Sequence, residues 1–328
     1  MNCRLWAAVA CAMAVACNSP TKAVAPSGAD PYADLPQRST DSAGLGEPVD
    51  LALALTAVDP ATGVAATVIG AVRDKGPWSG QLAIVLPELG QPPENYRELA
   101  REIARGGHHA LVVPSPLAQT LAEVCGSDAA CYTDGRAELL DGTDRAPKVT
   151  LKYADCLQNR LVMVILALAK GGQGWGQFVV SGKPNWPALQ LVGHGEGAGE
   201  AAFVGTKLIV ARVVLIGGPL DGAADQPAAW LTATHATPNK QWFAFGHTGD
   251  PLWKRMGSAW TAVGLGAGPL SWPSVDAGAV FGVQGMTTAL ANPAARLSLA
   301  TDADTPRDTA GKPKYRAAWR VLVGAAPQ

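Results

Sequence analysis

The chain has 328 residues, of which 48% are hydrophobic and 16% are charged, and its formal net charge is −1. This length and apolar content support one sizeable buried core and exclude a chain that is disordered throughout. Because the charges nearly cancel and form no basic stripe, we expect neither a nucleic acid nor an electrostatically bound membrane surface as a partner.

The first residues predict an export signal. Met1–Cys17 combines Arg4 with an apolar run that is too short to span a membrane. The run ends in AVAC, which resembles a bacterial lipobox whose cysteine, here Cys17, is lipidated. We therefore expect an exported protein of the cell envelope, held at a membrane by an N-terminal lipid anchor. The alternative is an ordinary signal peptide with an incidental Cys17, and a secreted or periplasmic protein.

A linker and the start of a folded domain follow. Residues 18–46 are rich in Pro, Ser, Ala and Gly and predict a disordered tether. Residues 47–328 are expected to form the domain. Its first two β-type runs, Leu51–Val58 and Val64–Val72, flank the turn signal DPATG. They predict an antiparallel hairpin at the edge of a sheet.

Apolar strand-like runs then alternate with helical patterns. The expected strands are Leu82–Leu86, Ala110–Val113, Leu189–Val192, Ala211–Ile216, Trp242–Phe245 and Val280–Val283. The expected helices are one opening at Asn95, then Thr150–Lys170, Ala198–Gly205, Leu252–Val263 and Tyr315–Val323. This alternation predicts an α/β fold with a mostly parallel sheet covered by helices on both faces.

The cysteines predict one disulfide. Export would place them in an oxidising compartment. Cys125 and Cys131 enclose a short polar loop and are the natural pair, within a polar excursion over Cys125–Asp144. Cys156 lies in an apolar helical pattern and is expected to be a buried free thiol. Since neither a CxxC pair nor an HExxH motif is present, we expect no metal site and no cofactor.

The stretch around Gly195 is the most informative part of the chain. The strand Leu189–Val192 breaks at GHGEG, and a helix of small residues follows. Strand, glycine turn and helix are the local plan of the nucleophile elbow G-x-S-x-G. The position of the nucleophile is occupied by Gly195, which has no side chain that could attack a substrate.

Several stretches together resemble a family of exported bacterial α/β-hydrolase-fold proteins. In chain order, from Leu82 to Gly324, they are LAIVLPELGQPPENY, HHALVVPSP, CGSDAAC, QNRLVMVILALA, GWGQF, LVGHGEGAGEAAFVG, ARVVLIGGPLD, WFAFGHTGDPLW and YRAAWRVLVG. GHGEGAGEA and GHTGDP are the most specific of these. The resemblance implies an α/β-hydrolase fold whose G-x-S-x-G elbow is degenerate, with the nucleophilic serine replaced by Gly195.

The resemblance also implies positions for the other catalytic parts. The oxyanion-hole loop corresponds to Pro87–Gly90. If Glu88 points inward, its carboxylate repels an oxyanion and accepts the N–H groups of the hole; if it points outward, it faces water. Asp250 matches the catalytic acid, although it also suits a helix N-cap before Pro251.

The base is missing from its expected place. The nearest match is Arg296, and no histidine follows Asp250, so the order nucleophile, acid, histidine is not completed. Arginine stays protonated and cannot act as a base. An Arg296–Asp250 ion pair is one way to fill the vacated site.

Three functions fit these residues. The first is a catalytically inactive protein that binds a small molecule or a protein in the former cleft, near Leu89, His194 and Glu196. The second is an active serine hydrolase or esterase with a substitute nucleophile, Ser115, and His194 or His247 as base. The third is a structural module of the cell surface without a ligand site.

Overall fold

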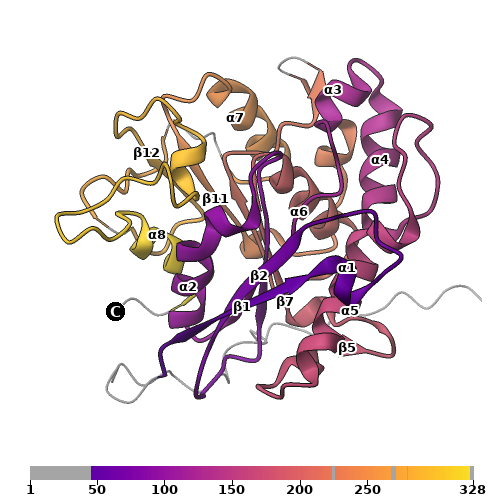
Figure 1. Cartoon of the computed structure of the whole chain (residues 1–328). Coiled ribbons are helices and arrows are strands. Elements are labelled where there is room, and N and C mark those ends of the chain that lie inside the picture. The colour runs from indigo at the N-terminus through magenta and orange to yellow at the C-terminus, as the bar shows by residue number, and fades with distance from the viewer. Residues whose placement is uncertain (1–45, 224–225, 267–270, 279, 326–328) are drawn as a thin grey trace, which may run out of the picture. The chain divides into compact units, whose positions relative to one another are not determined.

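A mixed, mostly parallel sheet forms the centre of the domain (Figure 1). The computed structural model describes residues 46–223, 226–266, 271–278 and 280–325. The predicted export signal with Cys17, and the predicted tether apart from Gly46, lie outside the described residues. Within the described ranges, no helix has the length and apolarity that a membrane crossing requires.

The sheet has eight strands. In spatial order they are β1 (Pro48–Ala54), β2 (Thr67–Arg73), β4 (His109–Val112), β3 (Leu82–Leu86), β7 (Leu189–His194), β8 (Arg212–Ile216), β11 (Trp242–His247) and β12 (Gly285–Thr288). β2 pairs antiparallel with both β1 and β4, and every other neighbouring pair is parallel. The predicted α/β class and the N-terminal antiparallel edge pair are therefore confirmed.

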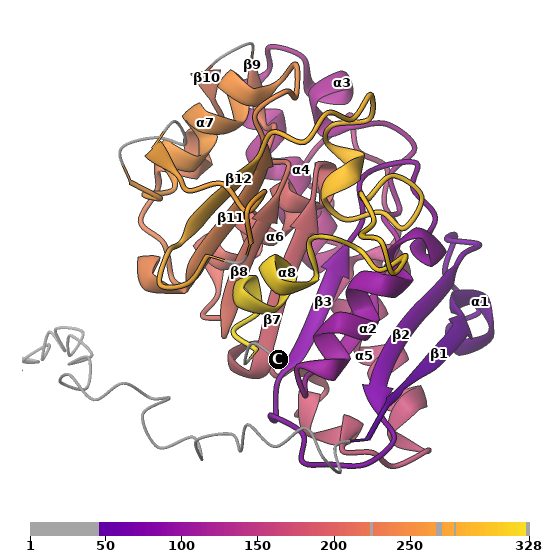
Figure 2. The same ribbon diagram turned by 90° about the vertical axis from the view of Figure 1, so that its left-hand side faces the viewer.

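Helices cover both faces of the sheet. α2 (Arg97–Arg105) and α8 (Arg316–Leu322) lie on one face (Figure 2). The other face carries α4 (Ala129–Asp141), α5 (Leu157–Ala169), α6 (Glu196–Lys207) and α7 (Trp253–Ala262). Successive side chains of a strand point to opposite faces. In β3, accordingly, Leu82 and Ile84 pack on the α5 and α6 side, whereas Ala83 and Val85 pack against α2 and α8.

Short elements complete the described chain. The remaining α-helices are α1 (Leu55–Val58) and α3 (Leu121–Cys125), and the small two-stranded sheets are β5 (Val179–Val180) with β6 (Lys183–Pro184) and β9 (Gly222–Ala223) with β10 (Gln226–Pro227). The 3-10 helices are η1 (Pro93–Tyr96), η2 (Tyr153–Asp155), η3 (Trp175–Phe178), η4 (Trp186–Ala188), η5 (Ala229–Thr232), η6 (Asn239–Gln241) and η8 (Leu297–Leu299).

The predicted polar excursion over Cys125–Asp144 is wrong, because most of it is the helix α4. Asp128 caps the helix by accepting the backbone N–H of Cys131, and Gly142 ends it in a left-handed conformation. The helix turns charged residues, among them Arg136 and Glu138, toward the interior. Its apolar periodicity is therefore too weak to reveal a helix in the sequence.

Three other predicted elements differ from the structure. The predicted strand Leu51–Val58 ends at Ala54, and Leu55–Val58 forms the helix α1. The long helix Thr150–Lys170 begins only at Leu157, since Asp155 instead bonds the hydroxyl of Thr62 and the N–H of Gly63. The last strand is Gly285–Thr288 rather than Val280–Val283. Gly282 has a positive φ of 73°, which breaks an extended run.

The strand order has a topological switch point between β3 and β7. These two strands are parallel neighbours, but the chain continues from β3 to β4 on one side and from β7 to β8 on the other. In open α/β sheets such a reversal leaves a crevice outside the carboxyl ends of the strands, and ligands bind there. The loop that holds Glu88 and the turn at Gly195 both lie at this point.

Candidate functional site

Gly195 forms a sharp turn between β7 and α6. Its φ of 53° and ψ of −111° are accessible mainly to glycine. The neighbouring glycines allow close packing. A Cβ at Gly193 would lie 2.4 Å from the Cα of Ala198, and one at Gly197 would lie 2.1 Å from the carbonyl oxygen of Leu86. The sequence folds here as predicted, with the helix pressed onto the end of the sheet.

Glu88 points into this turn, which decides between the two orientations left open by the sequence. Its Oε1 accepts the backbone N–H of Leu89 at 3.0 Å and the backbone N–H of Glu196 at 3.2 Å. A Cβ built on Gly195 would lie 1.8 Å from Oε2 of the same carboxylate. The Glu88 side chain therefore occupies the space that a side chain at position 195 would need.

Arg296 joins Glu88 to Asp250. Its Nη1 lies 3.4 Å from Glu88 Oε2, and its Nε lies 3.3 Å from Asp250 Oδ2. The Asp250 side chain is 1% exposed, whereas that of Arg296 is 27% exposed. Asp250 Oδ1 also accepts the N–H of Leu252 at 2.8 Å, in the turn before α7. The expected ion pair is present, together with a backbone role for the same carboxylate.

A buried tyrosine and histidine support the backbone on both sides of this cluster. His194 Nε2 is 2.9 Å from the carbonyl oxygen of Arg296, which can only accept, so Nε2 carries the proton. Nδ1 then accepts from the Tyr96 hydroxyl at 2.8 Å, and the same hydroxyl accepts the N–H of Glu88 at 2.9 Å. Burial lowers the pKa of His194 and raises that of Tyr96. Both rings are therefore neutral and hold the Glu88 and Arg296 loops in place.

The Glu196 side chain turns toward α4. Its Oε1 lies 2.6 Å from Nη2 of Arg136, which also lies 2.6 Å from Asp221 Oδ1. All three side chains are almost completely buried. Burial raises the pKa of Glu196, and the negative charge of Asp221 adds to this effect, although Arg136 opposes it. Burial by itself lowers the pKa of Arg136, but the two neighbouring carboxylates outweigh this effect and raise it. Sequence reasoning misses Arg136, because the polar composition of Cys125–Asp144 conceals the helix on which it lies.

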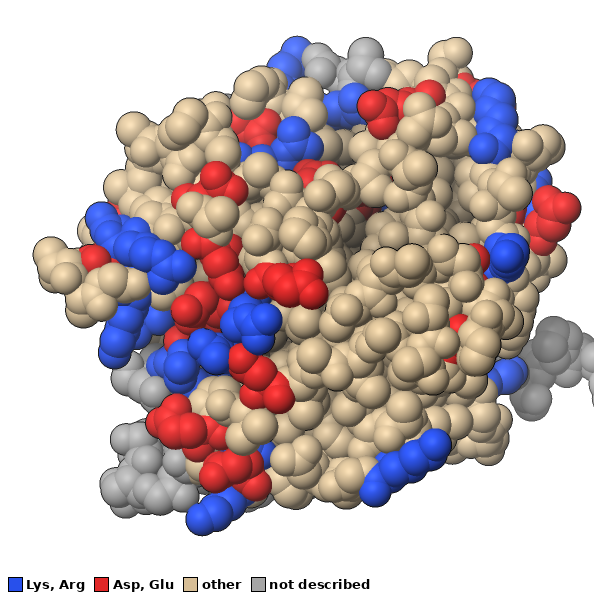
Figure 3. Space-filling view, in the orientation of Figure 1, with Lys and Arg blue, Asp and Glu red and all other residues tan. Residues whose placement is uncertain are grey.

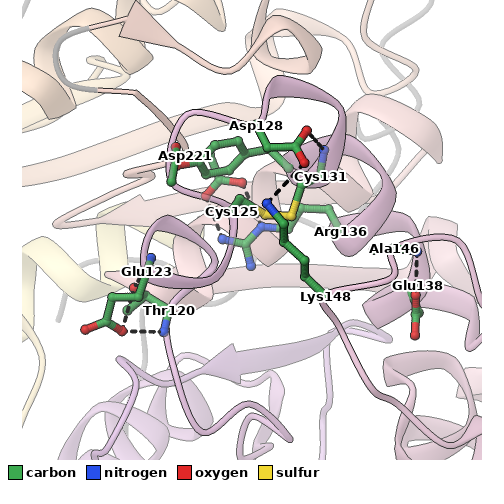
Figure 4. The surroundings of a disulfide bond; sticks show 12 residues. Thr120, Glu123, Cys125, Asp128, Cys131, Arg136, Glu138, Ala146, Lys148 and Asp221 are labelled. Atoms are coloured by element: carbon green, nitrogen blue, oxygen red, sulfur yellow. Dashed lines mark hydrogen bonds and ion pairs between the residues drawn. A yellow bond between two sulfur atoms is a disulfide. The ribbon is translucent and has the colours of Figure 1, made fainter.

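The predicted disulfide lies beside this ion pair (Figure 4). Cys125 at the end of α3 is bonded to Cys131 in the first turn of α4, with their Cα atoms 5.5 Å apart. A capping box between Thr120 and Glu123 begins α3. Cys156 is a buried free thiol, as expected, and burial raises its pKa.

The substitute nucleophile Ser115 lies near Glu88 and Leu89, and all three line a surface hollow of about 470 Å³. Its hydroxyl oxygen accepts the N–H of Leu117. Both nitrogens of His194 are bonded as described above. Those of His247 are bonded to the Leu290 carbonyl oxygen and to the N–H of Gly249. The two candidate bases thus have other partners than Ser115.

Charged side chains on the face seen in Figure 3 are of both signs and gather over α2 and β1, with a broad uncharged area beside them. In the described ranges, no group of three or more His, Cys, Asp or Glu residues is placed to hold a metal ion.

Protein-family models give no match to this chain, and curated protein sequences give no significant match either.

Proposed function

We propose that this chain is an exported, lipid-anchored protein of the α/β-hydrolase fold that has lost hydrolysis and binds a small molecule or a protein at the former active-site cleft. One observation carries the proposal. The Glu88 carboxylate accepts two backbone N–H groups, those of Leu89 and Glu196. In an α/β-hydrolase, the N–H after the nucleophile and one from the loop after an early strand form the oxyanion hole.

The local geometry supports this interpretation of the turn. A hydrolase nucleophile sits on a sharp, strained turn between a strand and a helix. Gly195 has that backbone conformation and that place in the chain. It also lies at the switch point in the strand order, where the chain continues from β3 to one side of the sheet and from β7 to the other. Ligands usually bind at this point in such sheets.

Loss of catalysis follows from three changes that fit one another. Gly195 supplies no nucleophile, and Glu88 supplies negative charge where an oxyanion would need donors. Arg296 pairs with Asp250 in the place of an imidazole. Since a guanidinium does not take up a proton at neutral pH, Asp250 has no base to orient.

A structural module is the second candidate, because the Glu88 carboxylate already fills the space above Gly195. The two functions differ in one measurable respect. A binding protein takes up a ligand at the crevice or in the adjoining hollow, whereas a structural module does not. No contact of Ser115 favours the active hydrolase.

Activity is tested with the purified domain and a series of variants. We expect the native chain to hydrolyse p-nitrophenyl esters no faster than background and to resist fluorophosphonate labelling. Gly195→Ser alone should also be inert, because the base and the oxyanion hole are still missing. The triple variant Glu88→Gly, Gly195→Ser, Arg296→His is the minimal repair and should gain labelling. The same triple variant with alanine at position 195 is its control. Native turnover above background, or fast turnover by Gly195→Ser alone, would refute the proposal.

The lipid anchor is tested on the full chain in a bacterial host fed radioactive palmitate. We expect the native protein to be labelled and to sediment with membranes. Cys17→Ser should remove the label, because Cys17 is the cysteine of the lipobox-like sequence AVAC. Cys11→Ser, a cysteine within the same apolar run, is the matched control and should keep it. Equal labelling of both variants would rule out Cys17 as the anchor.

A further inference from the structure

We infer that the turn at Gly195 and the side chain of Arg296 form a carboxylate-binding site, which Glu88 occupies from within the native chain. This inference rests on the proposed binding role of the site, and it specifies the chemical class of the ligand. It is carried by the donors that surround the Glu88 carboxylate and by the way both of its oxygens are used.

Two backbone N–H groups donate hydrogen bonds to this carboxylate, and one guanidinium forms an ion pair with it. The N–H of Leu89 comes from the loop after β3, and the N–H of Glu196 comes from the first turn of the 12-residue helix α6. The guanidinium of Arg296 comes from the turn before η8. A helix N-terminus favours an anion through its free N–H groups and its dipole. The guanidinium adds a full positive charge.

The donors match the two oxygens of a carboxylate. Oε1 accepts both backbone N–H groups, and Oε2 faces Arg296 at 3.4 Å. A spherical anion such as chloride cannot satisfy both sides at once. Planar two-oxygen anions fit guanidinium and N–H donors well. The site is therefore selective for the carboxylate shape as well as for negative charge.

The charge balance explains why the site needs an occupant. With Glu88 in place, one guanidinium lies between two carboxylates, those of Glu88 and Asp250. Without Glu88, Arg296 and Asp250 balance each other and the two backbone N–H groups lose their acceptor. Leaving partly buried donors without a partner is unfavourable. An external carboxylate would satisfy them.

The site is accessible to such a ligand. The side chains of Glu88 and Arg296 are 13% and 27% exposed, and Glu88 lines the hollow next to Ser115. In the native chain, a dissolved carboxylate competes with one that is covalently attached nearby. Because Glu88 is attached to the chain and already points into the site, it competes far better than a dissolved carboxylate, so small carboxylates bind the native chain poorly.

The test removes the tethered carboxylate and supplies a free one. Glu88→Ala is purified and its melting temperature is measured with sodium acetate, and with sodium chloride at the same concentration. We expect acetate at about 100 mM to raise the melting temperature of this variant by roughly 2–4 °C relative to chloride. Acetamide, which has the shape of acetate without its charge, should not. The native chain should show no acetate effect.

Two variants serve as controls. Glu94→Ala removes an exposed carboxylate from the same loop and the same hollow, and it should behave as the native chain. Adding Arg296→Met to Glu88→Ala removes the guanidinium and should abolish most of the acetate effect. Equal acetate effects in Glu88→Ala, Glu94→Ala and the native chain would overturn the inference.

If Glu88→Ala is too unstable to purify folded, its refolded yield from denaturant is measured instead. Acetate should then raise the yield above that in chloride or acetamide, and an unchanged yield would overturn the inference. The result is separate from catalysis. A hydrolytic native chain would refute the proposed loss of activity, whereas only the acetate experiment decides the carboxylate site.

Discussion

Glu88 and Gly195 depend on each other for space. A side chain at position 195 would collide with Oε2 of Glu88, so each residue fits only if the other stays as it is. The sequence predicted the importance of Gly195 from its place in GHGEG. It did not determine where Glu88 points, because its partner Glu196 lies 108 residues away along the chain. That choice depends on the folded arrangement of β3 and α6.

This dependence predicts a coupling energy between the two positions. Gly195→Ala should destabilise the chain through backbone strain and through collision with Glu88. In a Glu88→Gly background the collision is absent, so the same change should cost about 1–3 kcal/mol, as expected for strain alone. The difference between the two costs is measured by urea denaturation in a double-mutant cycle.

Gly126 provides a matched measure of the strain. Its φ of 56° and ψ of −116° almost equal those of Gly195, but a Cβ there would meet nothing within 4 Å. Gly126→Ala should therefore cost the same with or without Glu88. Purely additive effects at Gly195 and Glu88 would contradict the collision inferred here.

The hydroxyl of Tyr96 is expected to contribute to stability in addition to its buried ring. This hydroxyl accepts the N–H of Glu88 and donates to His194. Tyr96→Phe leaves the buried Nδ1 of His194 and the partly buried N–H of Glu88 without this partner, and we expect a loss of about 1–3 kcal/mol in the free energy of unfolding. Tyr153→Phe, at a residue that is 60% exposed, should be nearly neutral. Equal effects of the two changes would argue against the network.

At the scale of elements, α6 is held by charge as well as by apolar packing. Its Glu196 and Glu200, one helical turn apart, meet Arg136 of α4 and Arg160 of α5. All four side chains are buried. Inward charges of this kind blur the hydrophobic periodicity that reveals a helix. This is why the sequence of α4 indicates only a polar excursion, while the main part of the more apolar α5 is recognisable as a helix.

Loss of Arg136 should be costly, because it would leave Glu196 and Asp221 buried without their cation. We expect Arg136→Met to reduce the free energy of unfolding by about 3–5 kcal/mol, measured by urea denaturation. Arg145→Met is the control from the same region, since the side chain makes only exposed contacts, an ion pair with Asp141 and a hydrogen bond to the carbonyl oxygen of Thr143. That change should cost under about 1 kcal/mol. Similar costs for the two variants would show that the buried pair contributes little.

At the scale of the whole molecule, local patterns predicted the centre of the sheet best. Buried strands such as Leu82–Leu86 are continuous apolar runs, and the structure has this strand at the same residues. The edge strand Gly285–Thr288 has no such run. It is defined by pairing with β11 and by the close packing of Gly285 on the Trp272 ring. The positions of Gly195, Asp250 and Arg296 followed from motif and order, but their contacts required the fold.

Asp302 provides a test of a contact between distant parts of the chain. Both of its carboxylate oxygens accept the backbone N–H of Glu98 near the start of α2. Burial raises its pKa from 3.8 to about 6. The native state therefore binds this proton more tightly than the unfolded state does. The contribution of this proton to the free energy of unfolding is complete below pH 3.8 and is lost as the pH rises through about 6.

Asp302→Asn removes this titration and keeps one oxygen that can accept from Glu98. Relative to the native chain, the variant should gain about 1–2 kcal/mol between pH 4 and pH 7, allowing for solvent screening. Urea denaturation at several pH values measures the difference. Asp308→Asn is a control of opposite sign, because hydrogen bonds from the backbone N–H groups of Lys312 and Ala310 lower the pKa of Asp308. Relative to the native chain, the Asp308→Asn variant should lose stability as the pH rises through the acidic range. Parallel pH profiles for the two variants would show that Asp302 is not buried as described.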